Sequence, residues 1–161
     1  MKRIIIHHTG GSYAPSDIDL KSYHYLIDDQ GNVYKGRYTP EDNLNCNDGT
    51  YAAHTLKGNT GSIGIAACAN FRFNLKDKLT QYPITKQQFE SLCKLSATMC
   101  KKYNIKCDNI YTHYGFDIAH NIKQGKIDIT YLPFKPELNP LQVQDYFRHK
   151  IQYYISKCKL T

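Results

Sequence analysis

The chain has 161 residues, of which 41% are hydrophobic, a length that suits one compact domain better than two. It contains no run of about 18 apolar residues, which excludes a membrane-spanning helix, and its start lacks the apolar core of a secretory signal. The net charge of +7 favours an anionic partner, but the lysines are scattered without DNA-binding spacing, which argues against nucleic acid.

The first predicted element is the β-branched run Arg3-Ile4-Ile5-Ile6, which suits a strand buried on both faces. It ends at His7-His8-Thr9. Two β-prone arms at residues 23–27 and 33–37 flank a polar turn at residues 28–32, and this pattern predicts a hairpin.

Residues 38–61 are rich in Asn, Asp, Gly and Thr, so we expect a long surface loop that covers part of the molecule. Residues 62–68 predict a second apolar strand, and residues 70–84 look irregular. A helix then begins after Thr85, which can cap it. Its apolar residues follow a helical period: Phe89, Leu92, Cys93, Ser96, Met99, Cys100 and Tyr103.

Residues 109–112 predict a short strand that leads into His113, and residues 114–139 a long loop with Gly and Pro. A final helix is predicted over residues 141–157, with apolar residues at Val143, Phe147, Ile151 and Tyr154. Strands that alternate with helices predict an α/β fold, a single domain over residues 1–161 with a central mixed β-sheet flanked by helices.

Six cysteines, at positions 46, 68, 93, 100, 107 and 158, include no Cys-x-x-Cys pair. Cys93 and Cys100 share one face of the predicted helix, where they would act as small apolar residues. Without a signal peptide, we expect a chain made in the cytoplasm with reduced thiols.

Two histidines, His7 and His113, follow the C-terminal ends of predicted strands, where open α/β sheets present their ligands. A catalytic zinc takes three protein ligands and one water, and Asp128 offers a third ligand in a strand-like stretch where it alternates with Lys126. However, seven histidines can place two after strands by chance, in which case His7 and His113 are ordinary polar residues and Asp128 is solvated.

Five short motifs in order strengthen the zinc hypothesis. They are Ile4-Ile5-Ile6-His7-His8-Thr9, residues 23–27 with Gly31 and Gly36-Arg37, Ala53-His54-Thr55, Asn59 with Ser62-Ile63-Gly64-Ile65, and Thr112-His113-Tyr114. Together they resemble the type 2 N-acetylmuramoyl-L-alanine amidases, a superfamily that includes the peptidoglycan recognition proteins and the small amidase lysozymes of phages. The resemblance runs from about residue 3 to residue 134 and implies a fold like that of the peptidoglycan recognition proteins.

The resemblance implies that His7 and His113 are zinc ligands. The third ligand in the family is a cysteine or an aspartate two positions after a lysine, which Lys126-Ile127-Asp128 matches. The resemblance also assigns catalytic roles to Tyr23, which would orient the attacking water, and to Lys126, which would stabilise the oxyanion. Another branch of the family has a glutamate where this chain has Ala66, so the chain fits the branch with tyrosine and lysine.

The stretch between the second histidine and the lysine is longer than usual in the family. This leaves Asp117 and His120 as rival third ligands, of which His120 is the better. Otherwise, His24, His120 and His149 are expected on the surface.

The implied reaction is zinc-dependent hydrolysis of the amide between N-acetylmuramic acid and the L-alanine of the stem peptide. His54 matches a position in the family's substrate groove, and Asn59 and Thr60 would help to hold the muramyl-peptide. We expect a monomeric, endolysin-like and bacteriolytic (antimicrobial) enzyme that binds peptidoglycan, does not insert into membranes, and reaches the cell wall after release or delivery. The alternatives are a peptidoglycan-binding module without catalysis and a zinc hydrolase that acts on a small amide.

Overall fold

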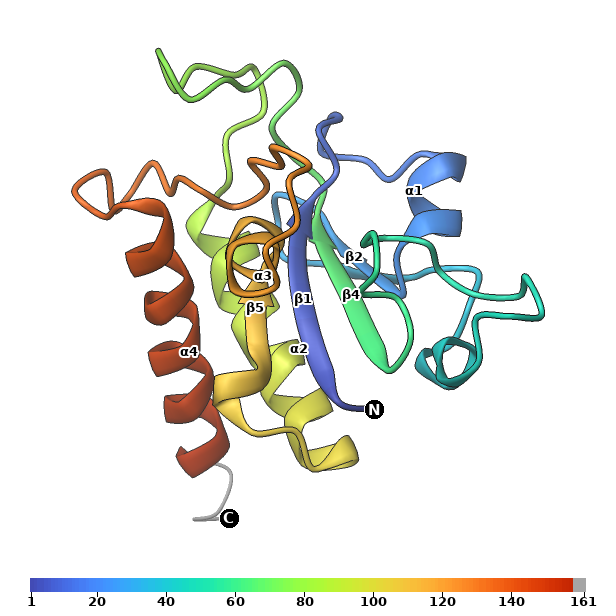
Figure 1. Cartoon of the computed structure of the whole chain (residues 1–161). Coiled ribbons are helices and arrows are strands. Elements are labelled where there is room, and N and C mark those ends of the chain that lie inside the picture. Colours follow the sequence, from blue (N-terminus) through green and yellow to red (C-terminus); the bar gives the residue numbers. More distant parts are fainter. Residues whose placement is uncertain (158–161) are drawn as a thin grey trace.

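In a computed structural model, which describes residues 1–157, a five-stranded mixed sheet forms the centre of a single domain (Figure 1). The strand order is β3-β2-β4-β1-β5, and only β2 and β3 pair antiparallel among the described strands. The strands are β1 (Arg3–His8), β2 (Tyr25–Ile27), β3 (Val33–Lys35), β4 (Ser62–Ala67) and β5 (Ile110–Thr112). The predicted α/β class, mixed sheet and hairpin are confirmed.

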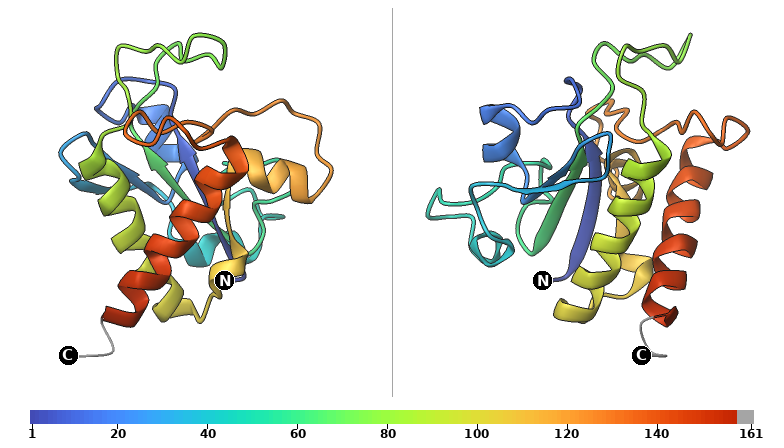
Figure 2. Two further views of the ribbon diagram at one scale, coloured as in Figure 1. Left: turned by 90° about the vertical axis from the view of Figure 1, so that its left-hand side faces the viewer. Right: turned by 180° about the vertical axis from the view of Figure 1, so that it is seen from behind.

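The helices are α1 (Asp17–Ser22), α2 (Lys86–Tyr103), α3 (His113–Ala119) and α4 (Pro140–Lys157), with 3-10 turns at Pro40–Leu44 and Cys107–Asn109. The two long helices, α2 and α4, pack side by side on one face of the sheet (Figure 2). No helix within residues 1–157 has both the length and the apolar character that crossing a membrane requires.

The main hydrophobic core lies between the sheet and these two helices. Alternate residues of β1 and β4 point into it because side chains of a strand alternate between the two faces. The sheet and the helices contribute buried residues that include Ile4, Ile6, Ile63, Ile65, Phe89, Leu92 and Phe147. Among the described residues, the opposite face has a small apolar cluster of Leu26, Ala66 and Cys68, with Leu20 and Tyr23 packed against it. Polar side chains such as His7 and His54 are buried on the same face.

The long helix α2 begins where the sequence predicts. The Thr85 hydroxyl accepts a hydrogen bond from the backbone N–H of Gln88 and forms a capping box. Its predicted inward residues, including Cys93 and Cys100, are buried except Tyr103, which is half-buried at the end of the helix. The described cysteines are free thiols, and Cys158 lies outside the described residues.

The prediction of a long loop over residues 114–139 was wrong at its start. Thr112 caps α3 by accepting a hydrogen bond from the N–H of Gly115, and Phe116 anchors the helix in the core at 1% exposure. Seven residues are too few to show a helical period in the sequence. The strand-like stretch predicted around Asp128 is instead a turn.

The segment 38–61 is a surface loop only in part. The side chain of Asn43 lies fully buried within it and donates hydrogen bonds to the carbonyls of Ala52 and Asn59. This loop therefore packs inward over the sheet and carries polar side chains with it.

The expectation that His24 lies on the surface was wrong. Its ring is 1% exposed. Its Nδ1 accepts the N–H of Gly64 at 2.9 Å, so its Nε2–H donates to the Oδ1 of Asn43 at 3.0 Å. Both ring nitrogens are thus satisfied in a neutral tautomer, and burial lowers the pKa of His24 to about 4.

We predict that this buried histidine makes the metal-free protein less stable in acid. An unfolded His24, with the ordinary pKa of about 6.5, takes up a proton before the folded one does, so the free energy of unfolding falls as the pH drops from 6.5 towards 4. In His24→Asn the side-chain oxygen replaces the Nδ1 acceptor without titrating. Between pH 7 and 5 the variant should therefore lose about 2 kcal/mol less stability than the wild type.

Urea unfolding in the presence of a chelator measures both losses, and His149→Asn at an exposed position is the matched control. Equal losses in His24→Asn and the wild type would contradict the prediction.

Candidate metal centre

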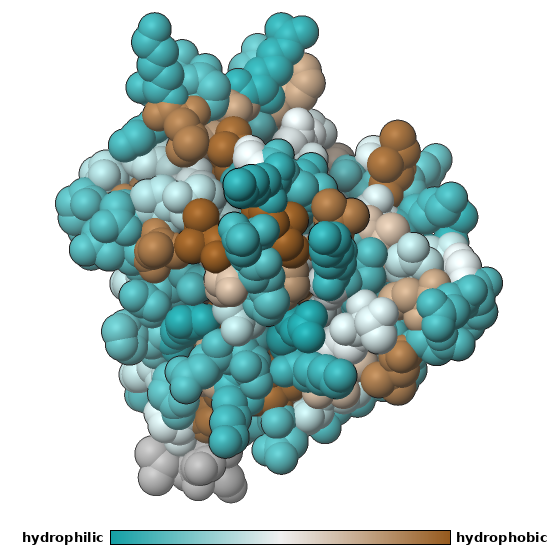
Figure 3. All heavy atoms as spheres, viewed as in Figure 1, coloured by the Kyte–Doolittle hydropathy of each residue, from teal (hydrophilic) through white to brown (hydrophobic). Residues whose placement is uncertain are grey.

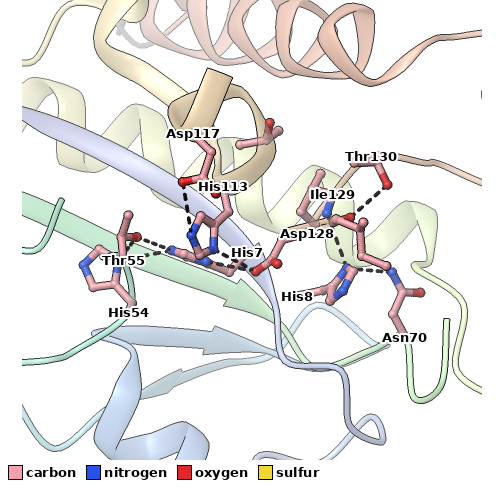
Figure 4. Close-up of polar contacts among 12 residues, drawn as sticks. His7, His8, His54, Thr55, Asn70, His113, Asp117, Asp128, Ile129 and Thr130 are labelled. Atoms are coloured by element: carbon pink, nitrogen blue, oxygen red, sulfur yellow. Dashed lines mark hydrogen bonds and ion pairs between the residues drawn. The ribbon is translucent and has the colours of Figure 1, made fainter. Parts of the chain in front are cut away.

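The side chains of His7, His113 and Asp128 converge at the C-terminal ends of β1 and β5 (Figure 4). The Oδ2 of Asp128 lies 3.1 Å from the Nδ1 of His7 and 3.3 Å from the Nδ1 of His113. One possible ligand atom from each residue lies within 4.8 Å of the others. Because β1 and β5 are neighbouring parallel strands, the two histidines reach the same edge of the sheet.

These three side chains fit a zinc ion. Zinc accepts imidazole nitrogen and carboxylate oxygen, and a tetrahedral site with bonds of about 2 Å separates its ligand atoms by about 3.3 Å. Burial lowers the pKa of His7 to about 4, so its ring is neutral. Although burial opposes ionisation of Asp128, the side chains of His113 and His7 hold its pKa well below its usual range.

Neither rival third ligand joins this group within the described part of the chain. His120 is exposed, and its Nδ1–H donates to the carbonyl of Phe116 at 2.9 Å. Asp117 lies on the far side of the His113 ring, with its Oδ1 3.7 Å from Nε2.

The position of Asp117 suggests what it does for His113. Asp117 is 4% exposed, and neither of its carboxylate oxygens has a hydrogen-bond partner among the residues that the structure describes. A carboxylate that faces the outer nitrogen of a metal-binding histidine favours the tautomer with the proton on that nitrogen. The Nδ1 of His113 would then be unprotonated and available to bind a metal ion together with Asp128. This arrangement was not predicted from the sequence, although a His–Asp pair four residues apart on a helix could have indicated it.

The His7 ring is likewise contacted at the nitrogen that points away from Asp128. Its Nε2 lies 3.1 Å from the Nδ1 of His54 and 3.4 Å from the hydroxyl of Thr55. The His54 ring in turn lies against Gly64 of β4, where a Cβ would come within 2.6 Å of it. Gly64 is therefore needed to make room for His54 beside the candidate ligand.

A cleft of about 280 Å³ opens beside His113. His54, Asn59 and Lys126 line it, and the side chain of Asn59 also shapes its wall by accepting the N–H groups of His54 and Thr55. The exposed Thr60 is not among the lining residues.

The other residues singled out in the sequence lie around the same centre. The Tyr23 ring lies 5.1 Å from the His7 ring, between centroids, at the C-cap of α1 and not in a strand. Burial, with a contribution from Asp128, raises the pKa of its hydroxyl. Ala66 is fully buried on the face that carries Tyr23.

We predict that Gly64→Ala disturbs the His54 side of this centre. The new methyl group would overlap the His54 ring, and overpacking of this kind costs about 1–3 kcal/mol of stability. Gly11→Ala is the matched control, because the nearest atom to a Cβ there is 3.4 Å away. Urea unfolding should show a clear loss for Gly64→Ala and little change for Gly11→Ala, and equal effects would refute the steric explanation.

The sequence matches the family model described as N-acetylmuramoyl-L-alanine amidase over residues 1–130, a range that contains His7, His113 and Asp128. This match confirms the family predicted from the five motifs. None of the curated proteins matches the chain.

Several solved structures share its fold. The N-acetylmuramoyl-L-alanine amidase LysC from Clostridium intestinale URNW is 21% identical at a TM-score of 0.58, with 94% of this chain and 85% of LysC covered. The Ph2119 endolysin from Thermus scotoductus MAT2119 bacteriophage Ph2119 is 18% identical at a TM-score of 0.55, with 92% and 82% covered. PlyL is 18% identical at a TM-score of 0.54, with 93% and 82% covered.

Proposed function

The chain belongs to the N-acetylmuramoyl-L-alanine amidase family, and on this basis we propose that it hydrolyses the amide between N-acetylmuramic acid and the L-alanine of the stem peptide with a zinc ion held by His7, His113 and Asp128. The convergence of two imidazoles and one carboxylate beside a cleft is the observation that supports this activity most directly. A metal-free binding module would not need to keep these three groups together in a buried place.

When bound, zinc supplies the Lewis acidity that activates water near neutral pH and polarises the amide carbonyl. The residues around the zinc ion would orient the reactants and stabilise the charge that develops. Because burial raises the pKa of Tyr23, its hydroxyl would stay protonated at neutral pH and could orient the water or the carbonyl by donating a hydrogen bond. The ammonium of Lys126, at the cleft, would stabilise the negative charge that develops on the carbonyl oxygen.

The substrate would lie along the cleft, where His54 and Asn59 are available to contact the muramyl-peptide. Thr60 would take part only if the substrate extends beyond the cleft. The net charge of +7 and the largely hydrophilic face seen in Figure 3 suit an anionic cell-wall polymer. We propose that the protein acts as a monomer on the cell wall, as a bacteriolytic, endolysin-like and therefore antimicrobial enzyme.

The metal ligands can be tested with Asp128→Ala and, as a control, His120→Ala. We expect the wild type to bind one zinc per chain and to release stem peptides from purified peptidoglycan. Asp128→Ala should bind zinc at least 10-fold more weakly and lose activity, because the third ligand is gone, whereas His120→Ala should keep both properties.

Competition with a zinc chelator and chromatography of released peptides measure these outcomes. A zinc-loaded wild type that releases no peptide would favour the non-catalytic binding module, and retention of zinc by Asp128→Ala would show that the ligand assignment is wrong.

The role of Lys126 predicts a different result. Loss of one donor to the developing oxyanion typically lowers kcat by about 10²–10³, so Lys126→Met should show a loss of this size with an unchanged affinity for zinc. Lys123→Met, an exposed lysine of the same loop, is the control and should leave kcat unchanged. Steady-state kinetics on a soluble muropeptide would decide, and an unchanged kcat in Lys126→Met would exclude this role.

A further inference from the structure

The residue after the first candidate ligand, His8, makes a contact that the mechanism above does not use. Successive side chains of a strand point to opposite faces, so His7 faces the candidate metal centre and His8 faces away from it. The ring of His8 is 8% exposed, and its Nδ1 lies 3.3 Å from the backbone nitrogen of Ile129. Two consecutive residues of β1 thus contact two consecutive residues of the loop, His7 with Asp128 and His8 with Ile129 (Figure 4).

The chemistry of these contacts determines the tautomer of His8. A backbone N–H can only donate, so the Nδ1 of His8 must be an unprotonated acceptor and the ring proton lies on Nε2. The Nδ2 of Asn70 lies 2.8 Å from the same Nδ1. It must therefore be the amide donor, and both groups donate to one nitrogen.

The backbone at Ile129 needs such a partner. Its φ of +56° lies in the left-handed region, which is a genuine outlier for a β-branched residue. Its side chain is fully buried in the main core. Residues in such conformations persist only when their surroundings hold them, and here the core holds the side chain while His8 holds the amide.

The second hydrogen-bond partner of His8, Asn70, connects it to the loop of residues 71–81. Asn70 lies at the base of the loop of residues 71–81, which projects at the upper end of the molecule in Figure 1. Its N–H donates to the carbonyl of Tyr82 at 2.7 Å, and it pairs with Gly11, just beyond β1. The amide that orients His8 is thus itself fixed to the end of β1.

We propose that His8 is a positioning residue: its unprotonated Nδ1 holds the amide of Ile129 and thereby presents the carboxylate of Asp128 to His7 and His113. The part of this inference that concerns zinc rests on the proposed function. The part that concerns the turn does not, because the contacts exist without a metal.

The test compares two variants of similar shape. In His8→Asn the side-chain oxygen occupies the same place along the side chain as Nδ1 and can accept the amide of Ile129. In His8→Leu no acceptor remains. We expect hydrogen exchange of the Ile129 amide in metal-free His8→Leu to be at least 10-fold faster than in the wild type, with Ile65 in β4 as the reference for global unfolding. The zinc affinity of His8→Leu should fall about 10- to 100-fold. His8→Asn should keep both the amide exchange of Ile129 and the zinc affinity close to the wild-type values.

A second variant leaves the histidine in place. In Asn70→Asp the carboxylate cannot donate, so the proton of His8 should move to Nδ1 and face the new acceptor. Nitrogen NMR of the imidazole would detect this change of tautomer. The Ile129 amide would lose its acceptor, and its exchange should accelerate as in His8→Leu. This variant decides the question if His8→Leu does not fold.

Unchanged exchange at Ile129 in these variants, or an unchanged zinc affinity in His8→Leu, would overturn the inference. If the wild type itself binds no zinc, the proposed function fails, whereas the exchange and tautomer measurements still decide whether His8 holds the turn.

Discussion

Asp128 must leave water to reach two buried imidazoles, and a buried carboxylate is unfavourable unless neighbouring groups compensate its charge. In this protein the carboxylate lies 3.1 and 3.3 Å from the Nδ1 atoms of His7 and His113. The two histidines can meet because β1 and β5 are parallel neighbours that end at the same edge of the sheet. With His7 neutral and Asp128 ionised, the group carries an excess of negative charge that a divalent cation would balance. The loop that carries Asp128 folds back over the end of β1, because only then can the carboxylate reach both histidines.

The rings of His7 and His113 are each oriented by a neighbouring side chain. The carboxylate of Asp117 lies behind His113, and His54 and Thr55 lie behind His7. Imidazole has two nitrogens, and the hydrogen-bond partner of one nitrogen decides whether the other carries the proton. The surrounding residues therefore do more than fill space, since they determine which nitrogens face the centre. The absence of a side chain at Gly64 is part of the same arrangement, because it makes room for His54.

Much of this organisation could be predicted from the sequence. Apolar runs and helical periods identified β1, β4, α2 and α4, and the position of histidines after strands indicated the centre. The sequence could not predict α3, which is too short to show a period, or the burial of His24, which depends on Asn43 from a distant loop. The resemblance to the family indicated Asp128 as the third ligand through the Lys126-Ile127-Asp128 motif, but the sequence could not exclude His120, since that depends on how the loop after α3 returns to the sheet. Local patterns report local structure, whereas these contacts join segments far apart in the chain.

One face of the sheet carries most of the apolar core, and the other carries the candidate metal centre. On one face, side chains such as Ile4, Ile6 and Phe89 are almost completely removed from water beneath α2 and α4, and apolar burial of this kind is the main stabilising contribution in a domain. On the other face, the apolar cluster is small. The polar groups His7 and His54 can therefore be buried on that second face, because the first supplies enough stability to hold them in place.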